Sequence, residues 1–147
     1  MDAKELVQKS VDEWNKKDKE AFLAHFTERS EITGPDGVIL HGLQGVETFW
    51  EVWQGAFADS ESTISNIFAA GNRACAEVTV ESTHTGTLYL PGGSQIPATG
   101  RHLCVLVAQV HNIRDSKFLT SHLYFDQFNL LTQLGLIPIH RVDSHRS

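Results

Sequence analysis

PATGRHLCVLVAQVHNIRDSKFLTSHLYFDQFNLLTQLGLIP, from Pro97 to Pro138, is the segment that decides the fold. Two long apolar stretches, Arg101–Ile113 and Phe118–Phe128, are joined by a polar turn, as is typical of a β-hairpin. Asp126 lies near the end of the second stretch among aromatic residues. A carboxylate in such surroundings usually meets a partner or loses its hydration, and a desolvated carboxyl can exchange protons near neutral pH. The function therefore depends on whether Asp126 faces a cavity or water.

The alternation of polar and apolar residues continues upstream of this segment. It predicts a hairpin of Ser62–Ala69 and Arg73–Thr85, joined at Gly71-Asn72. One face of the second strand carries Ala76, Val78, Val80, Ser82 and His84, and the other carries Cys75, Glu77, Thr79, Glu81 and Thr83. Such alternation is typical of an antiparallel sheet with one partly wet face.

The first third of the chain has helical periodicity. The pattern predicts helices at 2–17, 18–26 and 46–57, short strands at 31–33 and 38–40, and a last short helix at 130–134 that ends at Gly135. Trp50 and Trp53 make the helix at 46–57 the most aromatic segment. Their rings either pack on the sheet as core or line a pocket for a flat ligand.

Helices followed by a run of strands indicate the α+β class. We expect one domain over residues 1–147, with a flexible tail at 140–147. The expected architecture is a curved antiparallel sheet wrapped around the N-terminal helices, forming a cone (an α+β barrel) with an apolar pocket.

Composition excludes several classes of function. The chain has 147 residues and a net charge of -6, which argues against nucleic acid or an acidic membrane surface as a partner. No apolar run approaches the ~18 residues of a membrane span, and the charged, helical N-terminus does not resemble a secretory signal, so we expect a cytoplasmic protein. Cys75 and Cys104 are expected to be buried thiols. No metal-binding or nucleotide-binding motif is present, so we expect neither a metal nor an organic cofactor.

Period two also selects the candidate functional residues. Gln109 and His111 share a face with apolar residues of their strand, and His84 continues the apolar face of the preceding hairpin. On the last strand, His122, Tyr124 and Asp126 share a face. Each residue has a structural alternative. The histidines can be half-exposed or close a strand end, Gln109 can satisfy a backbone group, and Asp126 can cap the last helix, although Asn129 stands closer to the apolar run.

Four strings resemble the SnoaL-like polyketide cyclase family of the nuclear-transport-factor-like α+β cone superfamily, in order and spacing over essentially the whole chain. They are Thr83-His84-Thr85-Gly86, Pro97-Ala98-Thr99-Gly100-Arg101, Tyr124-Phe125-Asp126-Gln127 and Gln133-Leu134-Gly135-Leu136.

The resemblance implies a cofactor-independent enzyme that closes a ring by intramolecular aldol condensation. Asp126 matches the acid/base, and Gln109 with His111 matches the pair that holds the enolate. Trp14 matches a pocket-lining aromatic residue, and Trp50 and Trp53 match further pocket wall. The face pattern adds His122, His84 and Tyr124 as substrate-binding candidates.

The resemblance also implies a small hydrophobic substrate, polycyclic or aromatic, and a homodimer or homotetramer that covers the outer face of the sheet. The three Trp and many Phe favour a substrate that is smaller than a three- or four-ring polyketide or differently shaped.

Two other functions remain open at this point. One is an isomerase, a lactone- or ether-forming cyclase, or an epoxide-opening enzyme that acts on a terpenoid or polyether in the same pocket. The other is a non-catalytic ligand-binding or dimerisation module. An enzyme requires Asp126 and a histidine to face an apolar cavity. A solvent-facing Asp126, with a cavity that is small or filled by Trp50 and Trp53, favours the module.

Overall fold

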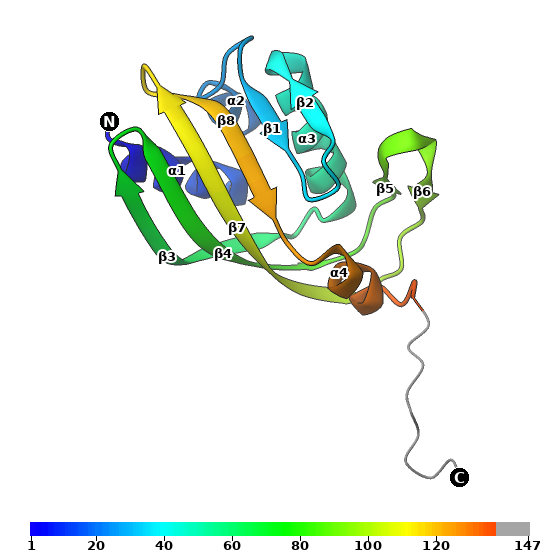
Figure 1. Cartoon of the computed structure of the whole chain (residues 1–147). Coiled ribbons are helices and arrows are strands. Elements are labelled where there is room, and N and C mark those ends of the chain that lie inside the picture. Colours follow the sequence, from blue (N-terminus) through cyan, green and yellow to red (C-terminus); the bar gives the residue numbers. More distant parts are fainter. Residues whose placement is uncertain (138–147) are drawn as a thin grey trace, which may run out of the picture.

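A curved six-stranded sheet forms the body of the molecule, with helices against its concave side (Figure 1). The computed structural model describes residues 1–137, so the expected tail at 140–147 lies outside the described residues. The strand order is β2-β1-β8-β7-β4-β3. The strands are β1 (Glu31–Thr33), β2 (Ile39–His41), β3 (Glu61–Ala70), β4 (Arg73–Thr83), β7 (His102–Arg114) and β8 (Lys117–Tyr124). A separate small sheet pairs β5 (Leu88–Tyr89) with β6 (Gln95–Ile96) around a short 3₁₀ turn, Pro91–Gly93.

The α+β class and the curved sheet are therefore confirmed, and the sheet remains open between its edge strands β2 and β3. The expectation of a purely antiparallel sheet is wrong, because β1 runs parallel to β8. This parallel contact brings a strand from the first third of the chain beside the last strand of the sheet, where it completes one side of the cone (Figure 1).

Helix ends are set by polar side chains that accept from free backbone N–H groups. Asp2 caps α1 (Ala3–Asn15), and Asp18 caps α2 (Lys19–Leu23). The third helix, α3 (Gly42–Ala56), begins earlier than its apolar pattern predicted. The last helix, α4 (Gln127–Gln133), also begins earlier than predicted, because Asp126 rather than Asn129 caps it.

The inner face of β4 is the one that its alternation predicted. Ala74, Ala76 and Val78 are buried against the helices. The outer face carries the two cysteines, and there the prediction is partly wrong: Cys75 is half-buried and Cys104 is exposed. Cys104 lies on the outward side of β7, next in sequence to the buried Leu103 and Val105.

Gln133 attaches α4 to the sheet. Its side-chain amide accepts from the backbone N–H of Cys104 and donates to the carbonyl of the same residue, both at 2.8 Å. The amide thus continues the hydrogen-bond ladder of β7 in place of a neighbouring strand. Arg101 donates to the Gln133 carbonyl from the other side of the contact. These bonds hold α4 at the edge of the concave face, where Leu130 and Leu134 are buried.

Gly86 joins the end of α3 to the segment that leaves β4. The backbone N–H groups of Thr85 and Gly86 both donate to the Ala56 carbonyl. A Cβ on Gly86 would lie 2.0 Å from the Gly55 carbonyl oxygen, which is closer than any real contact. A side chain at this position would therefore force the two segments apart.

We expect Gly86→Ala to lower the free energy of unfolding by about 1–3 kcal/mol through overpacking. Gly55→Ala is the matched control, because a Cβ at this helical position meets nothing within 4 Å and Ala favours a helix by up to ~1 kcal/mol. Urea denaturation of both variants is the measurement. Equal stability of the two variants would contradict the close approach of α3 to Gly86.

Candidate active site

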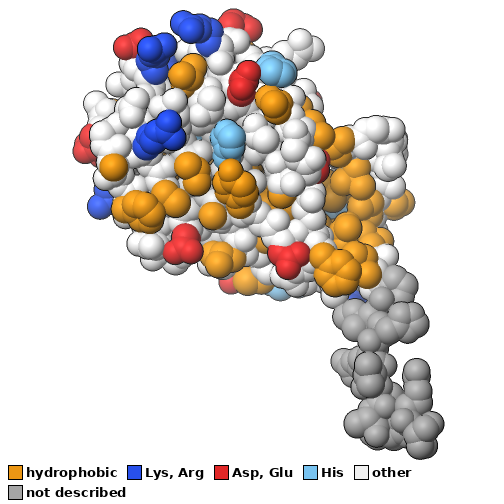
Figure 2. Space-filling model, in the orientation of Figure 1, with side chains coloured by type: hydrophobic (Ala, Val, Ile, Leu, Met, Phe, Trp, Pro, Cys, Tyr) orange, Lys and Arg blue, Asp and Glu red, His pale blue; other side chains and the backbone are white. Residues whose placement is uncertain are grey.

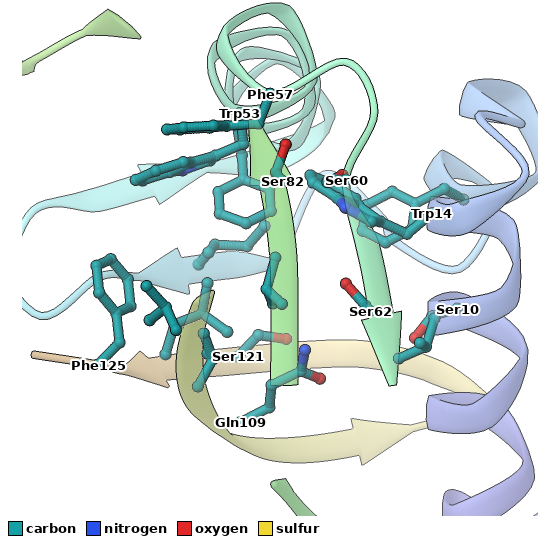
Figure 3. Close-up of a pocket in the computed structure, with 18 of the residues that line it drawn as sticks. Ser10, Trp14, Trp53, Phe57, Ser60, Ser62, Ser82, Gln109, Ser121 and Phe125 are labelled. Carbon is teal, nitrogen blue, oxygen red and sulfur yellow. The ribbon is translucent and has the colours of Figure 1, made fainter. Parts of the chain in front are cut away.

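A largely apolar cavity of about 150 Å³ lies between the concave face of the sheet and the helices (Figure 3). Its wall extends along β7 from Leu103 to Gln109 and includes Val80 and Ser82 at one end of β4. Six residues of strand separate Leu103 from Gln109, or about 20 Å at ~3.3 Å per residue. A small volume spread over this length describes a narrow cavity, which suits a flat or extended ligand. The polar groups gather near its two ends.

At one end, Gln109, His111 and Ser121 form a chain of hydrogen bonds. His111 Nδ1 lies 2.7 Å from Ser121 Oγ, and His111 Nε2 lies 2.9 Å from Gln109 Oε1. The strand register explains the contact, because β7 places His111 directly opposite Ser121 on β8. The inner residues of β4 beside this pair are Ala74 and Ala76, whose small side chains leave room for it.

The direction of this chain follows from the acceptor at one end. Gln109 Oε1 can only accept, so His111 Nε2 carries a proton and donates it. The other nitrogen, Nδ1, then accepts from the Ser121 hydroxyl. Gln109 therefore keeps its amide N–H groups available, and Figure 3 shows its side chain beside the cavity.

Burial, and to a lesser extent the nearby His122, lowers the pKa of His111 to about 4. Only 5% of the His111 surface is exposed, so water does little to stabilise an imidazolium. His111 is neutral at pH 7 as a result, in agreement with its one donated and one accepted hydrogen bond. Among the described residues that line the cavity, it is the one histidine, and no carboxylate or lysine accompanies it.

Two of the three predicted tryptophans line the cavity. Trp14 of α1 and Trp53 of α3 both contribute to the wall (Figure 3). Trp53 stacks on Phe57 and meets Phe125 edge-on, with ring centroids 6.0 and 5.9 Å apart. Trp50 does not line the cavity. It is buried in the core, where its ring packs edge-on against Trp14 at 4.9 Å.

Asp126 does not face the cavity, so its predicted placement is wrong. Its side chain is exposed and accepts from the backbone N–H of Asn129 at 3.0 Å, as the N-cap of α4. The neighbouring Phe125 and Leu130 line the cavity instead. The acid/base role that the resemblance implies for Asp126 stays a prediction.

His122 and Tyr124 also lie outside the cavity. They share a face of β8 with each other, as the alternation predicted, but that face is the outer one, and 52% of the Tyr124 surface is exposed. The Tyr124 hydroxyl lies 3.3 Å from His122 Nδ1. The inner face of the strand carries Ser121, Leu123 and Phe125.

His84 is fully buried but is not part of the cavity wall. Its Nδ1 lies 2.9 Å from Thr99 Oγ1 and accepts from the Thr99 backbone N–H. Burial lowers the pKa of His84, and a hydrogen bond with the Gly86 backbone partly opposes this effect. The ring packs on Phe57, with centroids 5.2 Å apart. His84 thus ties the loop before β7 to the end of α3, which is the structural alternative considered for it.

The sequence did not single out the serines of the cavity. The candidate residues of β8 were predicted on its polar face, and Ser121 lies on the other face. Leu123 and Phe125 already indicated that this other face is apolar. Ser60, Ser62 and Ser82 line the opposite end of the cavity. Of these three, only Ser82 could have been predicted to face the cavity, because the alternation of β4 places it on the apolar face.

Within residues 1–137, no group of three or more His, Cys, Asp or Glu side chains is arranged to hold a metal ion. In the same part of the chain, no helix has both the length and the hydropathy that a membrane span requires.

The fold and cavity define an α+β cone protein with an internal apolar cavity. The chain belongs to the SnoaL-like domain family, whose model matches residues 7–120. The family resemblance drawn from the four sequence strings is thereby confirmed. A comparison with curated proteins found no match.

Solved structures share this fold at low sequence identity. AclR from Streptomyces galilaeus, a proposed hydroxylase, is 21% identical with a TM-score of 0.78, over 95% of this chain and 89% of the other. TsrD from Streptomyces laurentii is 24% identical with a TM-score of 0.73, over 90% and 94%. IdmH from Streptomyces antibioticus, a proposed polyketide cyclase, is 20% identical with a TM-score of 0.72, over 89% and 96%. At sequence identities this low, the structural similarity shows a common fold and nothing about function.

The buried His111 makes stability depend on pH. Its pKa is about 4 in the folded protein and about 6.5 in an unfolded chain. Between these values the unfolded state binds more protons, so stability is full above pH 6.5 and falls as the pH drops toward 4, by up to about 3 kcal/mol. We expect His111→Gln to reduce the slope of unfolding free energy against pH in this window by up to about 1.4 kcal/mol per pH unit.

The exposed His102→Gln is the control and should keep the slope of the unaltered protein. Urea denaturation at several pH values from 4 to 7.5 measures the slopes. An unchanged slope in His111→Gln would show that His111 is not held neutral by burial.

Proposed function

We propose that this protein is a cyclase or isomerase that acts on a small, flat, largely apolar carbonyl compound through an enolate. The observation that carries the proposal is the chain Gln109–His111–Ser121 at one end of an apolar cavity. Membership of the SnoaL-like family and the fold shared with a proposed polyketide cyclase support the same reaction class. An intramolecular aldol condensation of a polyketide-type intermediate is the specific form that we favour.

In this mechanism, Gln109 binds the carbonyl oxygen of the substrate. Its amide N–H groups are free to donate because its oxygen is held by His111. A donor aimed at a carbonyl oxygen stabilises the negative charge that this oxygen gains as the enolate forms. The surrounding apolar wall excludes water and strengthens that interaction.

The proton moves through Ser121 to His111. Ser121 Oγ accepts the α-proton of the substrate while its own proton passes to His111 Nδ1, 2.7 Å away. The enolate then lies close to the new imidazolium, and this opposite charge offsets the burial that otherwise disfavours it. After the enolate carbon has attacked its electrophile, or has been reprotonated at a new position, the proton returns by the same path. No external oxidant or reductant takes part.

The shape of the cavity restricts the substrate. Trp14, Trp53 and Phe57 present aromatic faces and edges to the cavity. A narrow, aromatic wall favours a planar molecule of one or two rings and holds a flexible chain folded, which makes carbon attack intramolecular.

The proposal predicts that the protein accelerates α-proton exchange in a simple aromatic ketone. With 4-acetylbiphenyl in D₂O, we expect exchange of the acetyl protons above the buffer rate, followed by NMR. Gln109→Leu removes the donor and should slow the protein-dependent rate by about 10²–10³. Gln44→Leu, an exposed position on α3, is the matched control and should leave the rate unchanged.

Asp126→Asn separates the two candidate bases. Asn caps helices as well as Asp does, so α4 and the fold should be retained. If His111 is the base, exchange should stay within about twofold of the unaltered protein, because the cap does not touch the cavity. A loss of exchange with retained stability would instead assign the acid/base role to Asp126, as the resemblance implies.

A non-catalytic binding function is the second candidate. It is favoured by the exposed position of Asp126 and by the lack of a carboxylate among the described residues that line the cavity. A binding protein would take up 4-acetylbiphenyl, quench the fluorescence of Trp14 and Trp53, and leave the exchange rate at the buffer value.

We also propose that the outer face of the sheet binds a second copy of the chain. Phe68, Leu106 and Tyr124 lie on this face with 58%, 57% and 52% of their surfaces exposed. Figure 2 looks onto this side of the molecule and shows hydrophobic side chains spread across it. Exposed apolar faces of this kind are typical of interfaces between subunits.

We expect the unaltered protein to be a dimer or tetramer at micromolar concentration and Leu106→Glu to be a monomer, because a charge at an apolar interface loses its hydration. Size-exclusion chromatography with light scattering is the measurement. Tyr89→Glu, a similarly exposed position at 53% on the separate small sheet, should not change the mass. If the unaltered protein is a monomer under these conditions, this proposal is wrong.

A further inference from the structure

The end of the cavity opposite Gln109 is polar, and it has no role in the proposed chemistry. Ser60 lies just before β3, Ser62 lies on β3 and Ser82 lies on β4, and all three line the cavity (Figure 3). Ser60 and Ser82 are buried, with 4% and 3% of their surfaces exposed. Buried hydroxyls need partners, so the hydrogen bonds of these serines show what they have left for a ligand.

Ser82 offers an acceptor to the cavity. Its hydroxyl donates its single proton to Asp59 Oδ1 at 2.6 Å. Asp59 also accepts from the backbone N–H of Thr83, and these two donors hold the pKa of Asp59 below its usual range. The carboxylate is therefore charged and continues to accept the hydrogen bond from the Ser82 hydroxyl. Ser82 can then act toward a ligand only as an acceptor, through its lone pairs.

Ser60 offers a donor. The Lys17 ammonium donates to the Ser60 carbonyl at 2.9 Å and to Ser60 Oγ at 3.3 Å. Because an ammonium can only donate, Ser60 Oγ acts as the acceptor in that contact and keeps its own proton. Ser62 is held through its backbone by Asn15, which leaves its hydroxyl to act in either sense.

The backbone at Lys17 supports a role for this side chain. Lys17 is the residue after the C-cap of α1 and has a left-handed φ of 60°. The bonds from Lys17 N to Trp14 O and from Asp18 N to Glu13 O form the usual helix ending, in which Gly is the common residue. A lysine here is less favourable than glycine, yet it reaches Ser60.

One acceptor beside one donor matches a hydroxyl group. A ligand hydroxyl can donate to Ser82 and accept from Ser60 at the same time. A carboxylate cannot donate to Ser82, and repulsion from Asp59 opposes the attraction that Lys17 would exert on it. An ether can accept from Ser60 but leaves Ser82 without a donor, and an ammonium cannot accept from Ser60.

We propose that Ser60, Ser62 and Ser82 bind a hydroxyl group of the ligand, at the end of the molecule remote from the carbonyl that Gln109 holds. The substrate class is then an elongated, flat hydroxy-ketone or hydroxy-ester. This inference rests on the proposed carbonyl site for its second anchor. The strand positions of the two anchors are about 20 Å apart, and the concave sheet brings the side-chain tips closer together than that.

Four biphenyl ketones that differ only at the far end test the proposal. They are 4-acetylbiphenyl and its derivatives with a 4′-hydroxyl, a 4′-methoxy or a 4′-carboxylate group. Binding is followed by quenching of tryptophan fluorescence, since Trp14 and Trp53 line the cavity. We expect the hydroxyl compound to bind about tenfold more tightly than 4-acetylbiphenyl, as two added hydrogen bonds allow. The methoxy and carboxylate compounds should show no such gain.

Variants of the serine end locate the effect. Ser82→Ala and Ser60→Ala should each remove most of the hydroxyl gain, measured as the ratio of the affinities for the hydroxyl compound and for 4-acetylbiphenyl in the same variant. Lys17→Gly removes the ammonium and suits the left-handed backbone, so it tests the same contact without cost to the fold. Ser65→Ala is the control, because its hydroxyl donates to the Glu77 backbone away from the cavity.

The outcomes separate this inference from the proposed function. Equal binding of 4-acetylbiphenyl and its hydroxyl derivative, with both weakened by Gln109→Leu, overturns the hydroxyl site and leaves the carbonyl site standing. A tenfold gain that survives both serine substitutions also overturns it. If none of the four compounds binds, both proposals fail together.

Discussion

The pairing of β7 with both of its neighbours is the constraint on which the rest of the structure depends. The strand lies between β4 and β8. Its register with β4 is continuous from Arg73–Asn112 to Thr83–His102, and its register with β8 is continuous from Ala108–Tyr124 to Asn112–Thr120, which includes the end of the cavity at Gln109 and His111. Alternation along β7 then points Gln109 and His111 to the concave side, beside the small residues of β4. A shift of one residue would turn both side chains to the outer face, so the functional end of the cavity exists only in this register.

This dependence explains why the sequence predicted one strand well and the next one poorly. The inner face of β7 follows from alternation within one strand, and Gln109 and His111 lie where that pattern predicted. On β8 the alternation left open which of two faces lies inside. The polar set of His122 and Tyr124 was interpreted as the functional face. The apolar set of Leu123 and Phe125 takes the inner face because its burial stabilises the fold, whereas the polar set remains partly hydrated outside. The irregularity in the pairing near Asn112 adds a residue to β8 that no periodicity shows.

The position of Asp126 was decided by a local interaction that the sequence offered as an alternative. A carboxylate directly before a helix accepts from a free backbone N–H, and that bond forms within a few residues whatever the tertiary structure. The helix therefore begins at Gln127, and Asn129 supplies the donor instead of acting as the cap. The serines were missed for the opposite reason. Their importance comes from Asp59 and Lys17, whose side chains reach them from other segments, and a contact of that kind leaves no mark in the periodicity.

Both ends of the cavity follow one electrostatic rule. The polar groups that line the cavity are a neutral amide, hydroxyls and an imidazole, while the charges of Asp59 and Lys17 lie behind the serines and fix which way their hydroxyls point. A permanent charge in this wall would lose its hydration to the apolar surroundings, at a cost of several kcal/mol. Neutral dipoles avoid that cost and still stabilise a charge that exists only during the reaction, such as an enolate oxygen. The depressed pKa of His111 follows the same rule, because at neutral pH this histidine is uncharged, and in the proposed reaction it becomes charged only as the enolate forms beside it.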